Sequence, residues 1–137
     1  MKKFINDPKN LTQELLEGFA IAHRDLVRVR SEKIVCRANP KSEHKVALVT
    51  LGGAGHEPAL SGFVGEGMLD YSVVGDIFAA PGPPKVLEAL RLAKRPAGIL
   101  FVVLNHAGDV LSANMAMEMA NQEGIPYKLL LTHEDIA

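Results

Sequence analysis

The sequence of 137 residues contains no tryptophan, two tyrosines and a single cysteine, and only 5% of its residues are aromatic. The lone cysteine, Cys36, cannot form a disulfide within the chain, which favours a reducing compartment. No apolar run approaches the roughly 20 residues that a membrane-spanning helix needs. Asn6, Asp7 and Pro8 stand where a signal peptide would need an apolar stretch. The sequence therefore predicts a soluble, cytoplasmic protein that does not bind membranes.

The chain also lacks an excess of charge of either sign. Fifteen basic and 16 acidic residues give a formal net charge of -1, and no long run of either sign occurs. This balance argues against a nucleic-acid-binding surface and against a disordered charged tail. With 47% hydrophobic and 23% charged residues, the composition is that of an ordinary globular protein. We expect a single α/β domain over residues 1–137, large enough for a real core.

Hydrophobic patterns alternate between strands and helices along the chain. Strands are predicted at residues 33–37, 46–51, 71–75, 98–104 and 125–131, with helices over about 11–22, 83–93 and 110–123. Such alternation favours a layered α/β fold with a mostly parallel sheet flanked by helices. The chain ends just after its last predicted strand, so we expect it to be one part of a larger structure.

Three packing predictions follow from the same patterns. The 33–37 segment alternates between apolar and polar residues, which suggests a half-exposed strand at an edge. Cys36 lies among its apolar positions and is interpreted as a small core residue. Leu111, Met115 and Met119 recur at helical spacing and are expected to pack into the core.

The apolar segment 46–51 ends in three glycines within four residues, followed by His56, Glu57 and Pro58. Open α/β sheets place their ligands at such corners after buried strands. A second corner, Asn105 to Asp109, follows the apolar segment 98–104. If the two strands are neighbours, both corners face the same crevice.

Several common motifs fail at these corners. A Walker loop needs a Lys followed by Ser or Thr after its last glycine, and a dinucleotide fingerprint needs a glycine where Pro58 stands. A nucleophile elbow needs a serine at the position of Ala54. The histidines are not spaced as metal ligands, so no metal site is expected. His56 is either a structural loop residue or an acid/base, and Asp109 is either a helix N-cap or a proton acceptor; together they suit a small, oxygen-rich molecule.

Four segments carry a resemblance to a known family. They are Lys2-Lys3-Phe4-Ile5-Asn6-Asp7-Pro8, Gly52-Gly53-Ala54-Gly55-His56-Glu57-Pro58-Ala59, Gly62-Phe63-Val64-Gly65-Glu66-Gly67-Met68-Leu69 and Asn105-His106-Ala107-Gly108-Asp109-Val110. In these segments the chain resembles the dihydroxyacetone kinase family, in the amino-terminal part of the substrate-binding K subunit. The resemblance covers essentially the whole chain, and it implies the fold of that subunit's first domain.

The resemblance implies phosphorylation of dihydroxyacetone, or of a related short ketose, on a terminal hydroxyl. By motif, Gly53 would offer its backbone to the substrate, His56 would hydrogen-bond the substrate as an acid/base, and Asp109 would be the general base. The chain itself would bind no cofactor. ATP or ADP and Mg²⁺ would bind a separate L subunit, and in phosphotransferase-linked systems a third subunit rephosphorylates that nucleotide. The second half of the K subunit and further copies of the chain, in a homo-oligomer, are the other expected partners.

The chain departs from the family pattern at several positions. Leu104 stands where the family commonly has lysine, His106 and Ala107 replace tyrosine and threonine, and Ala80 replaces a common serine. The family also holds its substrate as a hemiaminal on a histidine downstream of this region, to which no residue here corresponds. Two hypotheses follow: a kinase component, inactive alone, that needs its partner chains, or a non-catalytic ketose-binding or regulatory module derived from the kinase.

Overall fold

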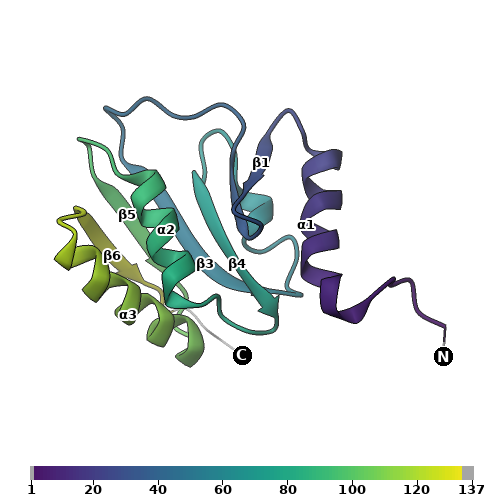
Figure 1. Cartoon of the computed structure of the whole chain (residues 1–137). Helices are drawn as coiled ribbons and strands as arrows, with labels where there is room; N and C mark the ends of the chain where they lie inside the picture. Colours follow the sequence, from purple (N-terminus) through teal and green to yellow (C-terminus); the bar gives the residue numbers. More distant parts are fainter. Residues whose placement is uncertain (1, 134–137) are drawn as a thin grey trace.

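The computed structural model describes residues 2–133 of the chain (Figure 1). Within this range six strands form one mixed sheet in the spatial order β1-β2-β4-β3-β5-β6. β3, β4, β5 and β6 are mutually parallel, whereas β1 and β2 pair antiparallel. The prediction of a layered α/β fold with a mostly parallel sheet is confirmed. The elements are η1 (Pro8–Asn10), α1 (Leu11–Ala22), β1 (Val27–Arg30), β2 (Ile34–Arg37), β3 (Ala47–Ala54), η2 (Ser61–Phe63), β4 (Tyr71–Ile77), α2 (Pro83–Ala93), β5 (Ile99–Val103), α3 (Ala107–Gln122) and β6 (Tyr127–Leu131).

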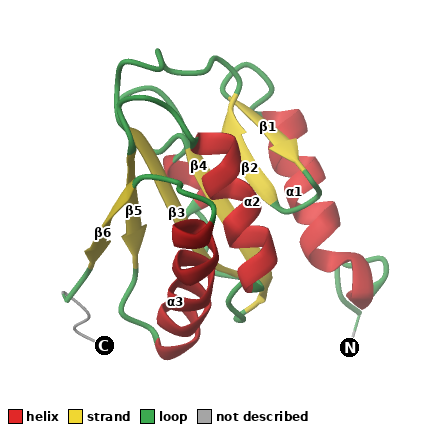
Figure 2. Cartoon of the chain, turned by 60° about the vertical axis from the view of Figure 1, so that its left-hand side comes forward, coloured by secondary structure: helices red, strands yellow, loops and turns green. Residues whose placement is uncertain are grey.

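α2 and α3 lie side by side on one face of the sheet, and α1 lies near β1 (Figures 1 and 2). Alternate residues of the central strands, among them Val49, Leu51 and Phe101, are fully buried beneath α2 and α3. On the other face, Leu16 of α1 is buried in a second cluster with Val35. Side chains of a strand point alternately to the two faces, so the central strands carry apolar residues at successive positions.

The second face of the sheet is covered only in part. The α1 cluster reaches β1, β2, β4 and the end of β3, but it includes no residue of β5 or β6. There Leu100 and Val102 are half-buried, and Leu130 of the edge strand β6 is 49% exposed. An apolar face over β5 and β6 therefore remains open to solvent.

The predicted core stripe of α3 is wrong. Leu111, Met115 and Met119 are 63%, 49% and 36% exposed, and the helix instead buries alanines and a serine: Ser112, Ala113, Ala116 and Ala120. Small residues let α3 approach α2 and the sheet closely, whereas the larger side chains do not fit between them. None of the helices in the described range is long and apolar enough to span a membrane.

The predicted exposed edge at residues 33–37 is also wrong. β2 lies between β1 and β4, and Ile34, Val35 and Cys36 are all buried. The strand that takes the edge, β1, was not predicted, because its Val-Arg-Val-Arg sequence is short and follows a polar stretch. The prediction that Cys36 is a small core residue is confirmed.

Candidate functional site

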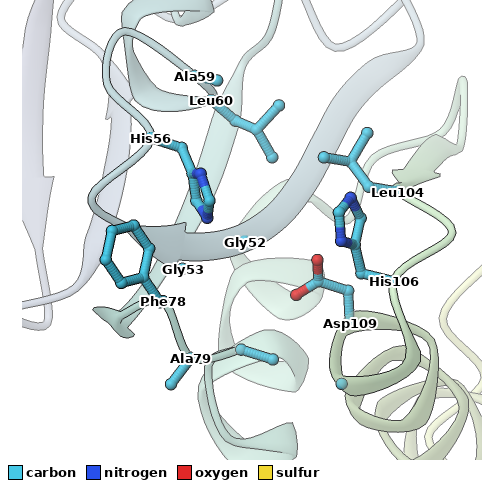
Figure 3. A pocket seen from close by; sticks show the side chains of 12 residues that line it. Gly52, Gly53, His56, Ala59, Leu60, Phe78, Ala79, Leu104, His106 and Asp109 are labelled. Carbon is cyan, nitrogen blue, oxygen red and sulfur yellow. The ribbon is translucent and has the colours of Figure 1, made fainter. Parts of the chain in front are cut away.

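A pocket of about 300 Å³ lies where β3, β4 and β5 end. Because the carboxyl ends of parallel strands meet at one edge of a sheet, the loops after them converge there. β3 pairs directly with β5, so the two predicted corners do face the same crevice. Gly53, His56 and Asp109 all line the pocket, and the roles assigned to them stay predictions. The lining residues are Gly52, Gly53, His56, Ala59, Leu60, Phe78, Ala79, Ala80, Leu104, His106, Gly108 and Asp109 (Figure 3).

β3 extends further into the glycine run than the sequence suggested, and it includes Gly52 and Gly53. A Cβ on Gly53 would lie 2.8 Å from the backbone nitrogen of Ala79 and 2.9 Å from its oxygen. These distances are shorter than any normal carbon contact, so glycine lets the loop after β4 pack against β3. Gly53 thereby shapes the pocket by having no side chain.

Glu57 supports the loop that carries His56. Its two carboxylate oxygens accept the Gly55 N–H at 3.1 and 3.0 Å, and the residue does not line the pocket. In the sequence Glu57 directly follows His56 at the corner after the apolar segment 46–51. In the structure its carboxylate closes the turn between β3 and the pocket residue His56.

Phe78 is a pocket residue that sequence reasoning missed. Its ring lies 5.1 Å from the His56 ring, centroid to centroid, at an interplanar angle of 63°. Its φ of 54° is unusual for a bulky residue, and its N–H donates to the Ala54 carbonyl at 2.8 Å. The loop after β4 could have been included from the sequence, since any strand parallel to β3 ends at the same edge.

Asp109 enters the pocket from the first turn of α3. The N-cap residue of that helix is His106, so the N-cap interpretation of Asp109 is wrong. Asp109 is 8% exposed, and this burial raises the pKa of its carboxyl, an effect opposed by nearby His106 and His56. Figure 3 shows the His56 ring and the Asp109 carboxylate directed into the same space. A carboxylate with a raised pKa is a better proton acceptor than an exposed one.

The rest of the lining is mostly apolar. Leu60 and Leu104 lie on one side of the pocket in Figure 3, and no lysine or arginine is among the lining residues. Ser112 of α3 donates a hydrogen bond to the Pro81 carbonyl, which fixes the helix against the loop after β4. Within residues 2–133, no three His, Cys, Asp or Glu side chains gather as a metal site would require.

These features define the chain as an α/β domain with a small-molecule pocket at the carboxyl edge of its sheet. The Dak1 domain family matches residues 17–137, and the chain belongs to this family. The dihydroxyacetone-binding subunit DhaK of the PTS-dependent dihydroxyacetone kinase from Lactococcus lactis subsp. lactis is 44% identical over 137 residues. That alignment covers 99% of this chain and 41% of the relative, so the chain spans about two fifths of the relative's length.

Solved structures share the fold closely. The dihydroxyacetone kinase of C. freundii, solved in complex with AMP-PNP and Mg²⁺, superposes with a TM-score of 0.89 at 35% identity over 98% of this chain and 26% of that one. The dihydroxyacetone kinase operon co-activator DhaQ superposes with a TM-score of 0.83 at 32% identity, over 90% of this chain and 38% of the co-activator. The same fold thus occurs in a kinase and in a regulator.

Proposed function

We propose that this chain binds dihydroxyacetone, or a related short ketose, as the substrate-binding component of a dihydroxyacetone kinase-type phosphotransferase. The observation that carries the proposal is the convergence of Gly53, His56 and Asp109 on one pocket in a member of the Dak1 family. A buried carboxylate beside two imidazoles suits the hydroxyls of a small sugar. The L. lactis relative is named for binding the same substrate.

Each pocket residue has a proposed role in the reaction. The backbone at Gly53 positions the ketose, and His56 hydrogen-bonds it. Asp109 accepts the proton of the terminal hydroxyl, whose oxygen then attacks the phosphoryl group. Phosphoryl transfer depends mainly on positioning and on charge neutralisation. The raised pKa of Asp109 supports its role as the base.

The phosphoryl donor is proposed to bind elsewhere. Mg²⁺ prefers several oxygen ligands, whereas the lining residues supply one carboxylate, that of Asp109, and two imidazoles. We therefore assign ATP or ADP and Mg²⁺ to a nucleotide-binding L subunit. We also assign the rest of the site to a second half of the K subunit, and expect the chain to form homo-oligomers in the cytoplasm. The isolated chain is then inactive as a kinase.

A second function is favoured by a specific observation. Leu104 gives the pocket an apolar wall, and a solved co-activator shares the fold. A regulatory module would bind the ketose through the same residues without passing on a phosphoryl group. The two functions differ in turnover and not in binding.

Titration of the full chain with dihydroxyacetone, followed by NMR, tests the shared part of both functions. We expect saturable shifts around Gly53 and Asp109 that are lost in Asp109→Asn and kept in Asp25→Asn, an exposed aspartate outside the pocket. Absence of these shifts would contradict both functions. Mixing the chain with a second K half, an L subunit and ATP-Mg²⁺ then separates them. Phosphorylation of dihydroxyacetone supports the kinase component, and binding without turnover supports the regulatory module.

A further inference from the structure

A second, smaller recess lies at the opposite end of β4 from the pocket, where that strand begins. It measures about 30 Å³, enough for one water-sized group. Four basic side chains line it, and its one acidic lining residue is Asp70. The lining residues are Arg30, Cys36, Arg37, Pro40, Lys41, Asp70, Tyr71 and Arg95.

The acceptor atoms of Asp70 are already in use. Its Oδ1 lies 3.3 Å from Arg37 Nη1, and its Oδ2 lies 2.8 Å from Lys41 Nζ and accepts the Leu48 N–H at 2.8 Å. The residue is 2% exposed, and both oxygens of this buried carboxylate have at least one partner. Four cations against one carboxylate leave three positive charges uncompensated within the recess.

Arg95 carries part of this excess charge in a partly buried position. Its Nε donates to the Ala93 carbonyl at 3.1 Å, but its Nη1 is buried without a hydrogen-bond partner. Arg30 forms no ion pair with any carboxylate among residues 2–133; its neighbour is the Cys36 thiol. Buried guanidinium N–H groups almost always have an acceptor, and leaving one unpaired is costly.

The Tyr71 hydroxyl donates to the Leu92 carbonyl at 3.2 Å, and it does not accept a hydrogen bond from Arg95 Nη1, which has no partner. Burial raises the pKa of Tyr71, and Arg95 and Arg30 both oppose that rise, which places both guanidinium groups near the same ring. A water molecule would accept a hydrogen bond from one N–H but would leave the positive charges uncompensated. An anion would accept that hydrogen bond and would also compensate the positive charges.

We propose that Arg95 and Arg30 bind a small oxyanion of the phosphate class at this recess, with one oxygen inside it and the remainder at its mouth between the basic side chains. Planar guanidinium groups match the oxygens of phosphate better than they match a monatomic ion. The site lies at the other end of the sheet from the ketose pocket, so it does not depend on the proposed function.

Titration of the full chain with inorganic phosphate at low ionic strength tests the site, with NMR signals of Cys36 and Tyr71 as the readout. We expect saturable binding that Arg95→Met weakens about tenfold or more, the effect of losing a charge-assisted hydrogen bond. The matched control is Lys94→Met, which removes the same charge from an exposed residue outside the recess. A parallel titration with glycerol phosphate distinguishes free phosphate from a phosphate monoester as the preferred ligand.

Two results would overturn the site. One is the absence of saturable shifts with phosphate and with the monoester. The other is equal weakening by Lys94→Met and Arg95→Met, which would mean diffuse attraction to a basic surface. Should Arg95→Met fail to fold, Arg30→Gln replaces it, because Arg30 is exposed and its loss leaves the core intact. Binding of dihydroxyacetone should stay unchanged in these variants, since none of the altered residues lines the ketose pocket.

Discussion

The burial of the Asp109 carboxyl has a cost in stability. The carboxyl is buried in the first turn of α3, and the burial disfavours the charged form. Residues arranged in this way are common in binding and catalytic sites, where function opposes stability. Asparagine at position 109 has the same shape but no charge, so this substitution separates the effect of the carboxylate on stability from its effect on function.

We expect Asp109→Asn to raise the free energy of unfolding at pH 7 by about 0.5 to 2 kcal/mol. Because the folded-state pKa lies above the ordinary value of 3.8, the folded protein holds the proton more tightly than the unfolded chain. The free energy of unfolding of the wild type therefore increases as the pH falls through the folded-state pKa of Asp109. The difference in this free energy between wild type and variant narrows accordingly. Urea unfolding at pH 7 and near pH 4 measures the difference. A variant that is less stable at pH 7 would show that the carboxylate is stabilised by hydrogen bonds.

The role of Glu57 in its loop can also be tested with single substitutions. Its carboxylate accepts the Gly55 N–H, so Glu57→Ala should leave that amide open to exchange. We expect exchange at Gly55 to be about tenfold faster, for the loss of roughly one hydrogen bond. Glu57→Gln keeps one acceptor oxygen and should largely retain protection. Amide exchange followed by NMR measures both, and equal protection in the alanine variant would contradict the role in the loop.

At the scale of the elements, the end of β4 holds the wall of the pocket in place. Between Gly52 and Ala54 the pairing of β3 with β4 shifts by one residue, which is a β-bulge near Gly75. A Cβ on Gly75 would lie 1.9 Å from the Ala79 carbonyl oxygen. The bulge thus folds the Phe78 loop tightly back onto its own strand.

Gly75→Ala should therefore lower the free energy of unfolding by about 3 kcal/mol, since backbone has to move to admit the methyl group. The matched control is Gly18→Ala in α1, where a Cβ would meet nothing within 4 Å. There alanine should stabilise the protein by about 0.5 to 1 kcal/mol, because glycine is a poor helix former. Chemical denaturation of both variants checks the contrast. Similar stability in the two would refute the close packing at Gly75.

The elements predicted correctly from the sequence are those whose local hydrophobic pattern matches their burial in the fold. The buried strands and the corners at Gly53 and Asp109 follow from apolar runs that end in glycine or polar residues. Residues such as Met115 were misplaced, because an i, i+4 stripe of large side chains looks more hydrophobic than the alanine face that packs inside. Phe78 was missed because no recognised motif marks its loop, although the strand before that loop was predicted and ends at the same edge as β3.

At the scale of the whole molecule, the sheet separates three surfaces. The pocket that holds Gly53, His56 and Asp109 lies at the carboxyl ends of β3, β4 and β5, and the basic recess lies at the amino end of β4. The third surface is the apolar face over β5 and β6, together with the edge of β6 that pairs with no other strand among residues 2–133. Parallel sheets are normally covered on both faces, so this third surface favours association.

We expect the purified chain to associate with itself through this open face and edge. Leu130 lies on β6, the edge strand of the sheet among the described residues, and is 49% exposed there. Burying it against a second copy would remove apolar area from water. Leu130→Lys should shift the protein toward the monomer, because it places a charge where the second copy would pack. Ile21→Lys, which changes a 76% exposed residue on α1 away from this face, is the matched control and should leave the association unchanged. Sedimentation velocity over a range of concentrations measures the effect. A wild-type chain that stays monomeric throughout, or equal dissociation in the two variants, would rule out association through β6.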